Sequence, residues 1–171
     1  MINTKEYQIK ISTKLKNIFE EIKVEESMRL SHNIYTPRVD VAVGPFAYND
    51  SFAEEYNILL STHQELLNKL KEKSINKDWL DFDINENPRC FIAIEVENST
   101  GKDTKHLLGS ITNASILGKV GILIVVNNKN GLNNMKNYLK FAKEHNKIKD
   151  HLFQNVALII KKDFDEIFNI D

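Results

Sequence analysis

An apolar segment that ends in two glutamates is predicted to form a buried strand: Cys90-Phe91-Ile92-Ala93-Ile94-Glu95-Val96-Glu97. Successive side chains of a strand point to opposite faces, so Glu95 and Glu97 should share one face with Phe91 and Ala93. The other face should carry the four remaining side chains, those of Cys90, Ile92, Ile94 and Val96. Two neighbouring carboxylates at the end of an apolar strand repel each other and lose solvation, so we expect a compensating group beside them.

A third acid, Asp40, lies in a second predicted strand at about residues 38–43, which Gly44-Pro45 ends. Alternation predicts one face with Val39, Val41 and Val43 and another with Arg38, Asp40 and Ala42. If the two strands are neighbours, Asp40, Glu95 and Glu97 converge at one edge. Asp40 and Glu95 would then bind Mg²⁺ together with the backbone carbonyl of Val96 and several waters. Such an ion makes a bound water more acidic for in-line attack on phosphorus, and Glu97 would orient that water or help to hold a second ion.

The spacing of apolar residues predicts the remaining elements and the fold class. We expect helices over 4–26, 51–73, 103–117 and 131–145, strands over 38–43, 90–97, 120–126 and 156–160, and a short helix at the end of the sequence. Asp103 is the expected N-cap of the third helix and Gly118 its expected stop. The alternation of strand and helix from residue 90 predicts an α/β fold with a mixed, largely parallel central sheet flanked by helices.

Length and composition favour a single domain over residues 1–171, with a core that needs no disulfide. Cys90 is the only cysteine, which excludes an intramolecular disulfide framework and a cysteine-based zinc site. We expect a cytoplasmic protein, because the sequence lacks an apolar signal core and a transmembrane-length apolar run.

The charge is distributed unevenly between the two parts of the chain. Residues 1–100 hold 12 basic and 17 acidic side chains, whereas residues 101–171 hold 11 basic and 7 acidic ones. This asymmetry is consistent with a basic face that binds nucleic acid. It is equally consistent with the solvated face of one helix, which would carry Lys136, Lys140, Lys143 and Lys147.

The pattern of Asp40 on one strand and Glu95-Val96-Glu97 on the next resembles the PD-(D/E)xK, or restriction-endonuclease-like, superfamily. The resemblance covers roughly residues 15–126 and includes a helix before the aspartate strand and a helix and strands after the glutamate strand. It implies metal-dependent cleavage of DNA phosphodiesters, with Asp40 and Glu95 as ligands of Mg²⁺ or Mn²⁺. Glu97 stands where the family pattern has its lysine, and some restriction endonucleases carry glutamate there.

Further residues are candidates for the same site. Lys105, and Lys102 before it, would supply the missing positive charge to the scissile phosphate. Glu26, at the end of the predicted first helix, is a further candidate metal ligand, because superfamily members often carry an acid on that helix. Its alternative role is an ordinary salt bridge at a helix end. Arg29 and Arg38 would bind phosphate or neutralise the acids.

The sequence therefore predicts a Mg²⁺-dependent endodeoxyribonuclease, in a restriction or repair system, that binds DNA and works as a homodimer or in a larger nuclease complex. The alternative is a nuclease-like domain that has lost catalysis and serves as a nucleic-acid-binding or regulatory subunit. Glu97 in place of lysine favours the alternative, whereas the presence of all three acids favours the enzyme. A simpler reading of the three acids is an exposed strand face beside a lysine-rich helix.

Overall fold

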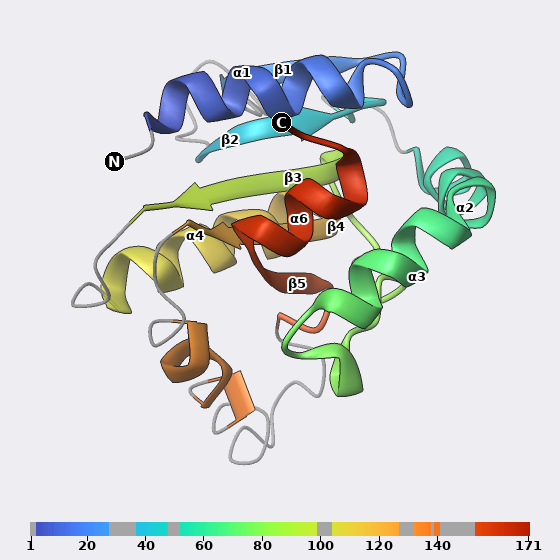
Figure 1. Ribbon diagram of the computed structural model, residues 1–171. Helices are drawn as coiled ribbons and strands as arrows, with labels where there is room; N and C mark the ends of the chain where they lie inside the picture. The colour runs from blue at the N-terminus through green and yellow to red at the C-terminus, as the bar shows by residue number, and fades with distance from the viewer. Residues whose placement is uncertain are drawn as a thin grey trace.

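A five-stranded mixed sheet in the order β1-β2-β3-β4-β5 forms the centre of the fold (Figure 1). The computed structural model describes residues 3–27, 37–47, 52–98, 104–126, 132–137, 139–140 and 153–171, without the side chains of residues 26, 27, 104 and 105. β2 (Arg38–Val43) pairs antiparallel with β1 (Ile22–Ser27) on one side and with β3 (Cys90–Glu97) on the other. β3, β4 (Gly118–Val125) and β5 (Val156–Ile160) pair parallel.

The predicted α/β class and mixed sheet are thus confirmed, and so is the parallel arrangement from residue 90 onward. The description "largely parallel" is wrong for the described strands, because β1 and β2 add two antiparallel ladders. β1 was not expected at all. Residues 22–27 form hydrogen bonds with the backbone of β2, and the sequence pattern did not indicate this pairing.

The predicted first helix, residues 4–26, is too long. α1 spans Thr4–Leu15 and is capped by Asn3, whose side chain accepts from the backbone N–H of Lys5. The chain then turns, and β1 begins at Ile22. Ile18 fits the helical spacing of apolar residues in the sequence, but its side chain is 39% exposed and is not part of the core.

The predicted second helix, residues 51–73, is two helices. α2 (Ala53–Thr62) and α3 (Gln64–Lys73) meet at His63, whose backbone departs from helical geometry at φ −103° and ψ 22°. The His63 ring packs against Phe19, with 4.6 Å between ring centroids. The break between α2 and α3 thus coincides with a contact to the turn between α1 and β1. The spacing of apolar residues within 51–73 does not indicate this break.

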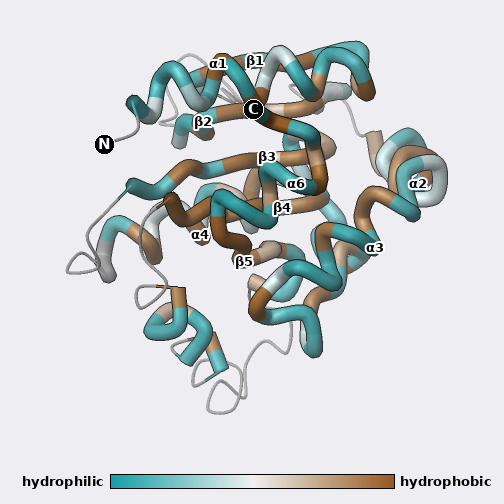
Figure 2. Tube along the Cα trace, in the orientation of Figure 1, coloured by the Kyte–Doolittle hydropathy of each residue, from teal (hydrophilic) through white to brown (hydrophobic). Residues whose placement is uncertain are grey.

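Helices cover both faces of the sheet. On one face the apolar core includes side chains from α1, α2, α3 and α6 (Lys161–Phe168). On the other face lies α4 (Thr104–Leu117), which packs on β3 and β4 through Leu107, Ile111 and Ala114. A helical segment at 132–137 adds the buried residues Leu132 and Met135 to the core on this face. Figure 2 shows the resulting concentration of apolar residues along β3, β4 and β5.

α4 leads directly into β4, because Gly118 is the first residue of that strand. A Cβ on Gly118 would lie 2.5 Å from the carbonyl oxygen of Val120 and 2.9 Å from the backbone nitrogen of Ala93. Gly118 therefore ends the helix as predicted, and it also allows the backbone to approach β3 closely. The predicted N-cap, Asp103, lies outside the described residues.

The outer edge of β5 is covered by the segment that follows α3. The backbone N–H of Ile75 donates to the carbonyl of Leu158 at 3.0 Å. The Asn76 side chain donates to the carbonyl of Val156 at 2.8 Å and accepts from the N–H of Leu158 at 3.0 Å. Asn76, fully buried, thus satisfies edge groups of β5 as a neighbouring strand would.

The last strand and the final helix lie where the sequence predicted them, at β5 and α6. The predicted helix over 131–145 is seen at 132–137 and 139–140, and its remainder lies outside the described residues. In the part of the chain that the structure describes, no helix is both long and apolar enough to span a membrane.

Candidate functional site

The three acids lie where the pairing between β2 and β3 stops. The final pair in this direction is Val41 with Ile94, and the next residues along the two strands are Asp40 and Glu95. In place of a further ladder bond, the backbone N–H of Val96 donates to Oδ2 of Asp40 at 2.7 Å. The prediction that neighbouring strands bring these acids to one place is therefore supported by the topology and by this contact.

Asp40 sits at an irregularity in β2. The predicted alternation fails there, because Val39 packs with Ala42 on the α4 face whereas Val41 and Val43 pack on the other face. On β1 the residue opposite Asp40 is Glu25, whose φ of 51° interrupts the regular pairing on either side. The carboxylate of Asp40 also accepts a hydrogen bond from the side chain of Gln8, which is buried in α1.

Glu95 and Glu97 both contact α4, so the prediction that they share a face is confirmed. Nδ2 of Asn113 donates to Oε1 of Glu95 at 3.2 Å, and the hydroxyl of Ser110 donates to Oε1 of Glu97. Glu95 is only 6% exposed. The alternation predicted for the start of β3 is wrong, because Cys90 packs on the α4 face and Phe91 on the opposite face. Phe91 instead packs near Phe19 and Tyr56, whose ring centroids lie 6.0 and 6.4 Å from its own.

Burial and mutual repulsion disfavour the charged forms of the acids at this place. Burial, together with the nearby carboxylates of Asp40 and Glu97, raises the pKa of Glu95 to about 8. The hydrogen bond from Asn113 acts in the opposite direction and lowers this pKa. The pKa of Asp40 is raised chiefly by burial, although the hydrogen bonds from Val96 and Gln8 oppose the shift. Both carboxyls would gain from a cation that takes the place of their protons.

Oxygen atoms that could bind such a cation face the same gap. The N–H and C=O of one strand residue point to the same edge, so the carbonyl of Val96 faces β2 together with the N–H that binds Asp40. The carbonyl of Glu97 faces the other way and accepts from Val126 at 2.9 Å. Within the described part of the chain, no donor reaches Oε2 of Glu95. Carboxylate and carbonyl oxygens are the ligands that Mg²⁺ prefers.

Other residues predicted for the site are placed less completely. Glu26 lies on β1 opposite Val39 and not on a helix, which corrects the predicted element, and its side chain is outside the described set. Lys105 lies in the first turn of α4, with its side chain likewise outside. Arg38 is exposed on β2, and Lys102 and Arg29 fall outside the described residues. The described residues contain no group of three or more His, Cys, Asp or Glu side chains arranged to hold a metal ion.

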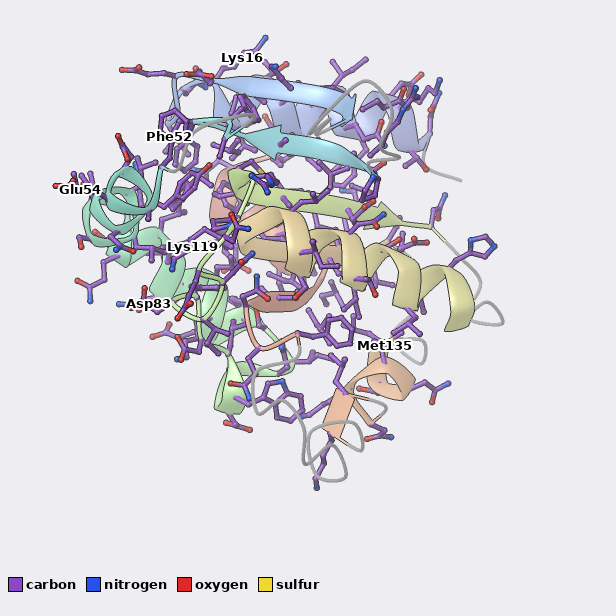
Figure 3. The ribbon with its side chains drawn as sticks, turned by 180° about the vertical axis from the view of Figure 1, so that it is seen from behind. Lys16, Phe52, Glu54, Asp83, Lys119 and Met135 are labelled. Atoms are coloured by element: carbon purple, nitrogen blue, oxygen red, sulfur yellow. The ribbon has the colours of Figure 1, made fainter. Side chains whose placement is uncertain are left out.

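A buried lysine lies at the opposite end of the sheet and has a structural role. Nζ of Lys119 donates to the carbonyls of Asp83 and Asn85 at 2.9 and 3.2 Å, and lies 3.4 Å from Oδ1 of Asp83 (Figure 3). A cavity of about 210 Å³ adjoins it, lined also by Tyr56 and Pro88. Lys119 is the second residue of β4, whereas Glu95 and Glu97 are near the end of β3, so Lys119 does not supply the charge that the acids lack.

Sequence reasoning missed Gln8, Ser110 and Asn113 as residues of the site. Ser110 and Asn113 flank the apolar stripe of Leu107, Ile111 and Ala114, and their spacing of three residues places them on one side of the helix. That spacing was the only available signal, since polar residues beside an apolar stripe are common. Gln8 gave no signal, because its burial depends on how α1 crosses β2.

Comparison of the chain with protein-family models, curated proteins and solved structures finds no match.

Proposed function

We propose that this protein is a metal-dependent nuclease that hydrolyses DNA phosphodiester bonds, as a restriction or repair endonuclease. The observation that carries the proposal is the pair of desolvated acids, Asp40 and Glu95, at the open end of the β2–β3 ladder. Their hydrogen-bond donors among the described residues are all neutral: Val96, Gln8 and Asn113. Acids that were only structural would be expected to pair with lysine or arginine in such a buried setting.

The proposed roles follow from what each residue contacts. Asp40, Glu95 and the carbonyl of Val96 would hold Mg²⁺ or Mn²⁺, which when bound lowers the pKa of a water and stabilises charge on the phosphate. Glu97, held by Ser110, would accept a proton from that water or orient it. Lys105 would contact the phosphate, and Glu26, opposite the neighbour of Asp40, would be an additional ligand.

The order of elements supports the resemblance to the PD-(D/E)xK superfamily. A helix, α1, precedes the Asp40 strand, and α4 with β4 follows the strand of Glu95 and Glu97. β3, α4 and β4 form a parallel crossover that covers the two glutamates with a helix. Under this proposal DNA is the partner, the setting is cytoplasmic, and pairing of two chains would allow both strands to be cut.

Plasmid cleavage with Mg²⁺ or Mn²⁺ tests the proposal. Asp40→Asn and Glu95→Gln are the sharpest variants, because both keep an acceptor for Val96 or Asn113 while removing a charge. We expect cleavage by the wild type, its loss in both variants, and no change in Glu72→Gln, which removes an exposed carboxylate from α3. A wild type that neither binds a divalent ion nor nicks DNA would refute the enzyme hypothesis.

The second candidate is a nuclease-like subunit that binds nucleic acid without cutting it. The observation that favours it is Glu97, which occupies the lysine position of the family pattern and is held by Ser110. Gel-shift binding of DNA by the wild type, without cleavage at any divalent-ion concentration, would support this candidate.

A further inference from the structure

α4 holds both glutamates of β3 through two neutral side chains. Ser110 and Asn113 are three residues apart and therefore lie on the same side of the helix. Ser110 donates to Oε1 of Glu97, and Asn113 donates to Oε1 of Glu95 at 3.2 Å. In both glutamates the other oxygen, Oε2, receives no hydrogen bond from a described residue. Among the described residues, each glutamate is thus held through one oxygen only.

Asn113 also spans the gap between the two acid-bearing strands. Besides Glu95 on β3, its Nδ2 lies 3.5 Å from the carbonyl oxygen of Arg38 on β2, beyond the last ladder pair. A single amide therefore contacts both strands after their backbone pairing has ended. Its position influences how far Glu95 lies from Asp40.

The neutral character of these donors matters for cation binding. A lysine or arginine in either position would compensate the glutamate itself and would compete with a metal ion. An amide or a hydroxyl orients the carboxylate and leaves its charge in place. Side chains that orient ligands in this way typically change metal affinity 10- to 100-fold when they are removed.

α4 is anchored firmly enough to hold these donors in place. Leu107, Ile111 and Ala114 on its inner face are at most 3% exposed. The helix continues without a loop into β4 at Gly118, and β4 pairs with β3 along its length. The donors and the glutamates therefore belong to one rigid unit of strand, helix and strand.

We propose that Ser110 and Asn113 are positioning residues that set the affinity of the Asp40–Glu95 site for a divalent cation. This inference rests on the proposed function, because it requires that the acids bind a metal. It assigns the two side chains no contact with DNA or with the reacting atoms.

The inference is tested by titrating the protein with Mn²⁺ and measuring binding both by calorimetry and by electron paramagnetic resonance. We expect Ser110→Ala and Asn113→Ala to raise the Kd for Mn²⁺ at least about tenfold. Ser110→Thr, which keeps the hydroxyl, should bind as the wild type does. The matched control is Thr112→Val, because the Thr112 hydroxyl donates to the carbonyl of Leu108 in the helix itself. Cleavage by the two alanine variants should recover at saturating Mn²⁺, since the defect lies in affinity.

The outcomes separate this inference from the proposed function. If the wild type binds Mn²⁺ and both alanine variants bind it as tightly as Thr112→Val, the positioning role is overturned while the metal site survives. If the wild type binds no Mn²⁺, the proposed function fails and the inference fails with it. Thermal unfolding in EDTA shows whether each variant is folded. If Asn113→Ala does not fold, Ser110→Ala still decides the test, because it removes only a single oxygen atom.

Discussion

The backbone N–H of Val96 donates a 2.7 Å hydrogen bond to the carboxylate of Asp40, at the point where β2 and β3 stop pairing. A side chain on β2 thereby takes over a bond that a backbone carbonyl would make in a continuous ladder. The bond ties Asp40 to the residue between the two glutamates. One of the candidate metal ligands thus also satisfies a backbone donor at the end of the β2–β3 ladder.

Glu97→Gln separates the roles of the two glutamates. Glutamine keeps an acceptor for Ser110 but cannot accept a proton from water, so we expect cleavage to fall about 100-fold. Binding of Mn²⁺ should weaken about tenfold, as in Ser110→Ala, because Ser110 acts on the site through Glu97, and thus much less than in Glu95→Gln, which removes a ligand. Single-turnover cleavage and Mn²⁺ titration on the same preparations measure the two effects. Unchanged cleavage by Glu97→Gln would exclude a catalytic role for Glu97.

Glu95→Gln should stabilise the metal-free protein at neutral pH. The pKa of Glu95 is raised to about 8 in the folded protein, whereas a glutamate in an unfolded chain titrates near 4.3. Between these values the unfolded chain binds fewer protons than the folded one, so folding stability falls as the pH rises. At pH 7 the cost is on the order of 3 kcal/mol, and below about pH 4 it vanishes.

Thermal unfolding in EDTA at pH 4 and pH 7 measures this effect. We expect the Tm of Glu95→Gln to exceed that of the wild type by roughly 5 °C or more at pH 7 and to match it at pH 4. Glu72→Gln, at an exposed position, should show neither difference. A Tm of Glu95→Gln below that of the wild type at pH 7 would show that burial does not keep this carboxyl protonated.

Divalent cations should stabilise the wild type and not the variants that lack a ligand. An ion present at 100 times its Kd adds about 2.7 kcal/mol to the free energy of unfolding, provided that it binds only the folded state. We therefore expect Mg²⁺ or Mn²⁺ to raise the wild-type Tm by several degrees, and EDTA to reverse the change. Asp40→Asn and Glu95→Gln should show no shift. Equal shifts in wild type and variants would place the ion elsewhere.

Two glycines of the same region should respond in opposite ways to alanine. Gly118→Ala places a Cβ 2.5 Å from the carbonyl oxygen of Val120, so we expect a loss of about 1–3 kcal/mol. Gly109→Ala, within α4, meets no atom within 4 Å and should gain up to about 1 kcal/mol of stability. Denaturant unfolding of both variants measures the difference. Equal stabilities would contradict the close contacts that a Cβ on Gly118 would make with Val120 of β4 and Ala93 of β3.

The sequence predicted β2, β3, β4 and β5 because their apolar runs are short, β-rich and bounded by turn residues. It did not predict β1, since Ile22 continues in sequence the helical spacing of Leu15 and Ile18, and only pairing with β2 selects the strand. It also joined α2 to α3, because the break at His63 accompanies a contact with Phe19, far away in sequence. These differences share one cause, which is long-range contact overriding a local pattern.

The candidate site was predictable to the same degree. Asp40, Glu95 and Glu97 were recognisable because charged side chains in apolar strands are unusual. Gln8, Ser110 and Asn113 were not, since neutral polar residues on helices carry no such signal. Their significance depends on which strand each helix crosses. The irregularity at Asp40, with Glu25 at positive φ beside it, likewise arises from pairing between strands and leaves no mark in the sequence.

The cover that Ile75 and Asn76 place on β5 limits how this sheet could associate with others. A strand from another molecule cannot add at β5, because the backbone groups of Val156 and Leu158 already have partners. Fibre growth by strand addition consumes one sheet edge at each step and needs a second edge to continue. Among the described strands, only β1 offers such an edge. Association through β1 would therefore stop at a closed pair, with both covered edges facing outward.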